Sequence, residues 1–136
     1  QAIGLTDVLL VNDLEAVRFS GLDDLDQAAE KFLGMGPEMV VLKLGPGGNT
    51  IYTREEVHHT PGFEVEEIDQ TGAGDSTTGA IVYGWLNSLA IEQVGLIANA
   101  TGASKVKKRG TGRNLPILEE IKNLLQENNI TLDFLP

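Results

Sequence analysis

The sequence contains no cysteine, which excludes a disulfide framework, a thiolate metal site and a cysteine nucleophile. It has no apolar run long enough to cross a bilayer and no basic, apolar N-terminal segment of the secretory type. These absences predict a cytoplasmic protein that does not enter a membrane. Basic residues are also few, and the formal net charge of −10 argues against nucleic acid as a partner.

The apolar residues that are present predict strands that alternate with helices. Residues 7–11 and 39–44 are apolar runs without alternation, as in buried strands, and 25–33 have the spacing of an amphipathic helix. Further strands are expected at 49–53, 57–60 and 63–68, and further helices at 12–18, 76–89, 92–106 and 117–125. The order predicts an α/β, three-layer fold with a mostly parallel sheet and flanking helices, and some antiparallel pairing within 39–68.

The few basic residues are unevenly placed. Five of the ten lie in a nine-residue segment, namely Lys105, Lys107, Lys108, Arg109 and Arg113. Such a segment could receive a small anion. The simpler interpretation is a solvated helix end, because cations are favoured near the C-terminal end of a helix.

A glycine-rich turn, "TGAGD" at residues 71–75, stands between a strand-like segment and a predicted helix. The unpaired N–H groups and the dipole at a helix start favour anions, and glycines allow close approach. Two familiar phosphate motifs do not fit. The third glycine of a dinucleotide fingerprint is two residues late, at Gly79, and Ala80-Ile81 stands where a P-loop has Lys-Ser/Thr.

Asp75 is unusual in such a turn, because a carboxylate repels phosphate. One interpretation is a general base that takes the proton of an attacking hydroxyl beside the phosphate site. The other is that Asp75 only caps the following helix.

Four segments in order resemble the PfkB/ribokinase-like carbohydrate kinases. "DQTGAGD" (69–75) is similar to the family signature D-x-T-G-A-G-D, and "NDLE" (12–15) to its N-x-x-E motif. "VVLKLGPGG" (40–48) resembles the strand and glycine turn that hold nucleotide phosphates, and "ANATGASKVKKRGTG" (98–112) the adenine-side helix and its loop. One departure is Thr77, where family members commonly have phenylalanine.

The resemblance implies roles for these residues, with ATP and Mg²⁺ as cofactors and with K⁺ as well in the cation-activated members. Asp75 would be the catalytic base, and the Gly72, Ala73 and Gly74 amides the anion hole. Glu15 would hold Mg²⁺ through water, while Asp69, Thr71 and Gly110 would bind a monovalent cation if this member uses one. The residues expected to contact the nucleotide are Asn12, Lys43, Gly45, Gly47, Gly48, Gly74 and Asn99.

The resemblance covers only the C-terminal part of the family pattern. We therefore expect residues 1–136 to be the nucleotide-binding and catalytic portion, without the N-terminal substrate half and lid. The predicted function is ATP-dependent phosphorylation of a hydroxymethyl group of a sugar, with this chain alone weakly active or inactive, and a homodimer is possible. The alternatives are a nucleoside kinase, a vitamin kinase of the same superfamily, or a non-catalytic nucleotide-binding module.

Overall fold

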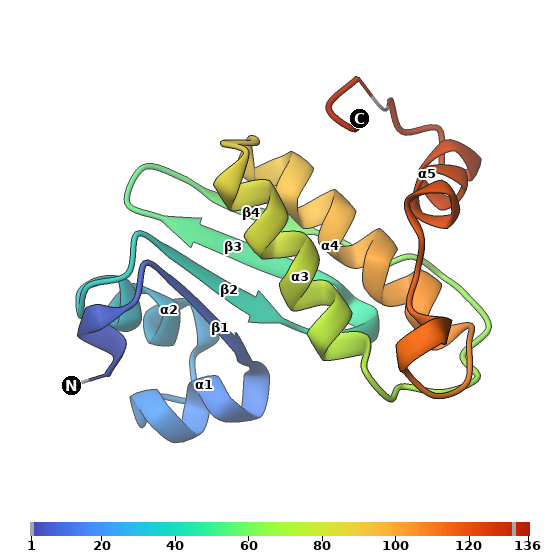
Figure 1. The fold of residues 1–136 in the computed structure, drawn as a ribbon. Helices are drawn as coiled ribbons and strands as arrows, with labels where there is room; N and C mark the ends of the chain where they lie inside the picture. Colours follow the sequence, from blue (N-terminus) through green and yellow to red (C-terminus); the bar gives the residue numbers. More distant parts are fainter. Residues whose placement is uncertain (1, 132) are drawn as a thin grey trace. The chain divides into compact units, whose positions relative to one another are not determined.

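The computed structural model describes residues 2–131 and 133–136. They form two compact units, one that extends to Pro61 and one that begins at Gly62. Figure 1 shows the helices and strands of each unit. No helix among the described residues is long and apolar enough to cross a membrane.

The first unit is built on a four-stranded sheet in the order β1-β2-β3-β4. Its strands are β1 (Val8–Asn12), β2 (Met39–Lys43), β3 (Asn49–Thr53) and β4 (Val57–Thr60). β1 and β2 are parallel, since two helices connect them, whereas β2-β3 and β3-β4 are antiparallel and joined by short turns. The sheet is thus mixed, and among the described strands its parallel part is the β1–β2 pair.

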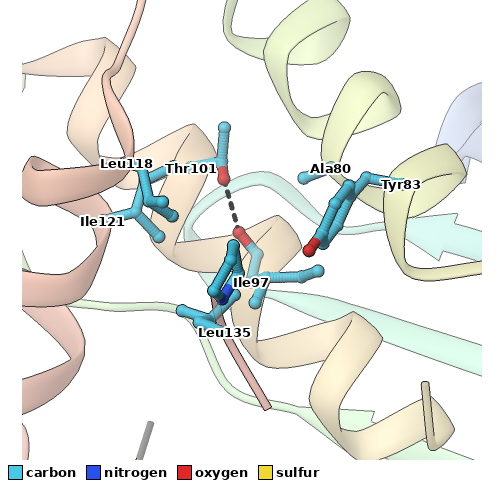
Figure 2. A pocket seen from close by; sticks show the side chains of 8 residues that line it. Ala80, Tyr83, Ile97, Thr101, Leu118, Ile121 and Leu135 are labelled. Carbon is cyan, nitrogen blue, oxygen red and sulfur yellow. Dashed lines mark hydrogen bonds between the residues drawn. The ribbon is translucent and has the colours of Figure 1, made fainter. Parts of the chain in front are cut away.

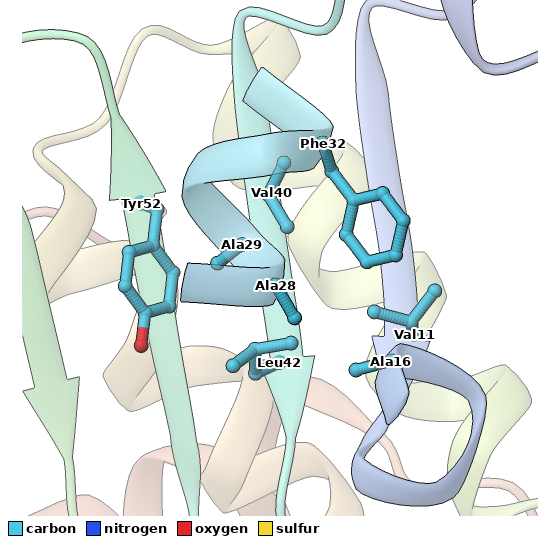
Figure 3. Close-up of a cluster of buried hydrophobic side chains, with 8 residues drawn as sticks. All are labelled: Val11, Ala16, Ala28, Ala29, Phe32, Val40, Leu42 and Tyr52. Atoms are coloured by element: carbon cyan, nitrogen blue, oxygen red, sulfur yellow. The ribbon is translucent and has the colours of Figure 1, made fainter. Parts of the chain in front are cut away.

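Two helices of the first unit, α1 (Asp13–Ser20) and α2 (Leu25–Leu33), connect β1 to β2. Figure 3 shows the apolar side of α2 against the sheet, with the ring of Phe32 between the helix and β1. Phe32 is fully buried, and burying a side chain of this size stabilises a fold by about 2–3 kcal/mol. The cluster contains Val11, Ala16, Ala28, Ala29, Phe32, Val40, Leu42 and Tyr52.

The second unit is helical, with α3 (Ala73–Leu86), α4 (Ile91–Val106) and α5 (Leu118–Glu127). Small residues let α3 and α4 pack closely. A Cβ on Gly84 would lie 2.8 Å from Val94 Cγ2, and one on Gly102 would lie 2.7 Å from Thr77 Oγ1. Thr77 therefore occupies a tight place against α4, where a larger side chain would require different packing.

Most predicted elements are confirmed within one to three residues, and one is wrong. Residues 63–68 form no strand, although they are rich in apolar and β-prone residues. Phe63 and Val65 instead pack on a core of Ala100, Leu124 and Leu125 in the second unit. Hydrophobic burial against helices has replaced strand pairing in this segment. Short 3-10 turns occur at Ile3–Leu5, Gly45–Gly47 and Gly112–Asn114.

Candidate functional site

The glycine-acid turn leads directly into α3. Gly72 is the N-cap residue, with a φ of 80° that a side chain would strain, and a Cβ there would lie 2.8 Å from Thr111 Cγ2. The amide of Ala73 donates to the Gln70 carbonyl at 3.0 Å, and that of Ser76 to the Gly72 carbonyl at 3.0 Å. The Gly74 and Asp75 amides lie between them in the first turn, where helix geometry supplies no carbonyl partner.

Asp75 lies in the first turn of α3 with its side chain exposed. The N-cap position belongs to Gly72, which has no side chain to accept a hydrogen bond. The capping interpretation required Asp75 to be the N-cap residue, and it is not. Its exposed carboxylate lies beside the free amides of the first turn of α3, which is a position that a general base can occupy.

Asp69, Thr71 and Gly110 are brought together, although 41 residues separate the first from the last. One Asp69 oxygen, Oδ1, accepts from the Thr71 amide at 2.9 Å and from the Thr71 hydroxyl at 2.6 Å. The other, Oδ2, accepts from the Gly110 amide at 2.7 Å. We call this arrangement the Asp69 clasp. The hydrogen bond from the Thr71 hydroxyl, followed by those from the two amides, holds the pKa of Asp69 well below its usual range.

Lys105 is the residue of this region that the sequence interpretation missed. It was grouped with a solvated helix end, but its side chain is fully buried in the last turn of α4. Its Nζ donates to the Lys108 carbonyl at 3.0 Å, and its Cε lies 3.7 Å from the place of a Cβ on Gly72. Helical periodicity is the signal that could have revealed it, since it continues the buried face of Val94, Ala98 and Thr101.

In the first unit, Asn12 and Glu15 are joined at the start of α1. The Glu15 amide donates to Asn12 Oδ1 at 2.8 Å, and the Asn12 amide donates to Glu15 Oε2 at 2.9 Å, which together form a capping box. Both residues thus have a structural role besides the predicted one. Lys43 is the register partner of Asn12 at the ends of the parallel strands, so the two residues are neighbours.

The turn after β2 is closed by its own backbone. The Leu44 amide donates to the Gly48 carbonyl at 2.8 Å, and the Gly47 and Gly48 amides donate to Leu44 and Gly45 at 3.0 Å each. Gly45 and Gly48 have φ values of 58° and 94°, which explains the glycines. A ligand can therefore approach the backbone of this turn closely, although the Gly47 and Gly48 amides already donate to carbonyls of the turn.

An apolar pocket of about 260 Å³ lies between α3, α4, α5 and the C-terminal segment. Figure 2 shows Tyr83 facing Leu118 and Ile121 across it, with the Thr101 hydroxyl bonded to the Ile97 carbonyl at 2.6 Å. None of the predicted site residues lines this pocket, and Asn99 lies elsewhere on α4, partly exposed. A pocket of this composition does not suit a phosphate or a sugar.

Each unit thus carries part of the predicted set. The first has Asn12 beside Glu15 and Lys43, and the second has the Asp69 clasp and the turn that begins α3. Among the described residues there is no cluster of three acidic or histidine side chains for a metal. Mg²⁺ does not need one, because it commonly binds through one or two carboxylates, water and substrate phosphates, so Glu15 fits that ion.

Comparison with known proteins gives consistent matches. The model of the pfkB family of carbohydrate kinases matches residues 1–118. A probable fructokinase-7 from Arabidopsis thaliana is 33% identical over 89% of this chain and 38% of its own length. A ribokinase from Staphylococcus aureus is 29% identical over 91% of this chain and 43% of its own length.

A solved structure of a putative ribokinase II from E. coli, in complex with ATP and Mg²⁺, is also similar. It has a TM-score of 0.86 and 31% identity, covering 93% of this chain and 41% of that one. The chain therefore has a ribokinase-like fold, as predicted. It spans about two fifths of the length of these relatives.

Proposed function

The chain belongs to the pfkB family of carbohydrate kinases, and on that basis we propose that it is the nucleotide-binding and catalytic portion of a sugar kinase. The reaction is transfer of the γ-phosphoryl group of ATP to a hydroxymethyl group of a sugar. The observation that carries the proposal is the exposed Asp75 in the first turn of α3, at a helix start whose N-cap glycine has no side chain.

Asp75 has the chemistry of the base in this reaction. Its carboxylate takes the proton from the attacking hydroxyl as the oxygen–phosphorus bond forms and the bond to the β-phosphate oxygen breaks. The exposed position leaves room for an acceptor sugar to approach. A base in this role contributes about 10²–10⁴-fold to the rate.

The amides of the same turn have the chemistry of an anion hole. The Gly72, Ala73 and Gly74 peptides are oriented by the helix start, and the absence of side chains at the glycines permits close approach by phosphoryl oxygens. The Gly74 amide is more available than the Ala73 amide, because the Ala73 amide donates to the Gln70 carbonyl. Helix geometry also leaves the Asp75 amide available in this turn.

The first unit supplies the polar groups for the nucleotide and its metal. Lys43 would neutralise phosphate charge as a flexible cation, and Gly45, Gly47 and Gly48 allow the chain to lie against the phosphates. Asn12 would contact the nucleotide, and Asn99 in the second unit would border the adenine. Mg²⁺ bound through water to Glu15 neutralises charge on the phosphates.

The experiment is titration of the 136-residue chain with Mg·ATP in a calorimeter, followed by an assay for ADP formation with ribose, fructose and nucleosides. We expect nucleotide binding with weak or absent turnover, because transfer needs both reactants held in line and the chain spans only part of its relatives. A chain that does not bind Mg·ATP would refute the nucleotide-binding assignment. Turnover at a normal enzymatic rate would refute the incomplete acceptor site.

A non-catalytic nucleotide-binding module is the second candidate. It would bind ATP without any role for the carboxylate of Asp75. A nucleoside kinase of the same family would instead show its turnover with nucleosides in the acceptor panel.

A further inference from the structure

Lys105 presents a buried positive charge that the proposed reaction does not use. Its side chain is fully buried, and lysine is almost never so unless its ammonium has partners. The hydrogen bond that holds it is the one to the Lys108 carbonyl at 3.0 Å. A buried ammonium that donates to a neutral carbonyl needs further electrostatic compensation.

The charge that compensates it is the Asp69 clasp. Attraction from the Lys105 ammonium adds to the hydrogen bonds that lower the pKa of Asp69. The clasp connects the segment before the turn to Gly110, and the stem of Lys105 passes against Gly72, 3.7 Å from the place of its Cβ. The stem of Lys105 therefore lies beside Gly72, the residue that follows Thr71 of the clasp.

This arrangement does not fit a monovalent cation at Asp69, Thr71 and Gly110. Both carboxylate oxygens of Asp69 already accept hydrogen bonds, one from Gly110 and two from Thr71. A potassium ion at this place would also be repelled by the fixed positive charge of Lys105. The Lys105 ammonium supplies the positive charge that such an ion would bring.

We propose that Lys105 takes the place of a monovalent cation in this chain: its buried ammonium supports the Asp69 clasp and the turn at Gly72, so that neither requires potassium. Lys105 is thus a positioning residue for the anion hole. Its effect on turnover rests on the proposed function, whereas its effect on cation dependence does not.

The test is thermal unfolding of the 136-residue chain without nucleotide, in KCl, NaCl and choline chloride at equal ionic strength. For the unaltered chain we expect no potassium-specific change, with midpoints within about 1 °C of one another. Because no nucleotide is present, failure to bind ATP leaves this result intact. A saturable stabilisation by K⁺ over choline would overturn the proposal without bearing on the kinase assignment.

The variant Lys105→Ala removes the ammonium and leaves space. We expect its midpoint to fall in choline chloride and to recover by roughly 5 °C when K⁺ or ethylammonium is added at many times its dissociation constant. The matched control is Lys107→Ala, an exposed lysine at the same helix end, which should show no such recovery.

Each outcome of these two measurements either supports or overturns the proposal. If the Lys105→Ala chain folds but its unfolding midpoint does not change with K⁺ or ethylammonium, the Lys105 side chain only fills space. That result would overturn the proposal. If that variant does not fold under any condition, the salt comparison of the unaltered chain decides alone.

Discussion

The Asp69 carboxylate accepts a hydrogen bond from the Gly110 amide at 2.7 Å and so joins the segment before α3 to the loop after α4. The same carboxylate accepts two hydrogen bonds from Thr71, which orient the turn that leads to Gly72. The start of α3 is therefore held by a charged group, and its stability should depend on whether that group is ionised.

Acid should weaken the second unit through Asp69. Its pKa is lower in the folded chain than the usual value of about 3.9, so its stabilisation is fully present above pH 4 and is lost as pH falls toward the folded-state pKa. The measurement is urea unfolding between pH 7 and pH 2.5 for the unaltered chain and Asp69→Asn. The two should differ most at neutral pH and converge below pH 4, and a constant difference would argue against this cause.

Gly72→Ala should destabilise the chain by about 1–3 kcal/mol. The new methyl group would require a left-handed backbone conformation and would approach Thr111 Cγ2 to 2.8 Å. The control is Gly79→Ala, at an exposed position of α3 with no atom within 4 Å of its Cβ site. That change should stabilise by about 0.5–1 kcal/mol, since alanine favours a helix interior. Urea midpoints compare the two, and equal losses would refute the strain at Gly72.

Gly102→Ala should destabilise the contact between α3 and α4. A Cβ there would lie 2.7 Å from Thr77 Oγ1, and overpacking of this kind costs about 1–3 kcal/mol. Thr77→Ala removes the obstructing oxygen, so the double variant should lose less stability than the sum of the single variants. Additive losses in this double-mutant cycle would show that Thr77 is not the obstacle.

Asp75→Ala should separate binding from chemistry. In a parent protein that also contains an acceptor-binding portion, we expect phosphoryl transfer to fall by about 10²–10⁴-fold while Mg·ATP binding is retained. Coupled assay of ADP formation and calorimetry measure the two properties. Transfer that survives the substitution would favour the non-catalytic interpretation of this residue, and Glu119→Ala, an acid in the first turn of α5, serves as a control.

The role of Asn12 in capping α1 and its expected role in nucleotide binding can be measured separately. Asn12→Ala removes the acceptor of the Glu15 amide and should cost α1 about 1 kcal/mol. Asn12→Asp keeps an acceptor for the cap but places a negative charge where phosphate is expected. It should therefore retain stability in urea and weaken Mg·ATP binding, and unchanged binding would mean that Asn12 serves the cap alone.

The sequence predicted best where local pattern and packing agree. The helix at Leu25–Leu33 was found at both ends, because its apolar spacing is flanked by the capping Asp24 and by Gly34. Residues 63–68 show the opposite case, since their strand-like composition serves packing on helices that lie far along the chain. Some antiparallel pairing within 39–68 was expected, but two of the three strand pairs, β2–β3 and β3–β4, are antiparallel, which is more than a mostly parallel sheet implies.

The site was predictable to the extent that its residues are neighbours in sequence. The turn at 71–75 was noticed from its glycines and the Asn12–Glu15 pair from its resemblance to a family motif, whereas burial of Lys105 depends on which face of α4 is covered. A lysine among other lysines gives no compositional sign of that burial. Helical periodicity applied to charged residues as well as apolar ones would have identified it.

The turn at Gly45–Gly48 has a consequence for binding thermodynamics. Three backbone hydrogen bonds already fix its conformation, so a ligand that lies against it does not have to order a flexible loop. Binding there avoids a loss of backbone entropy of roughly 1–2 kcal/mol for each residue that would otherwise be immobilised. A nucleotide would thus meet a preorganised surface in this part of the first unit.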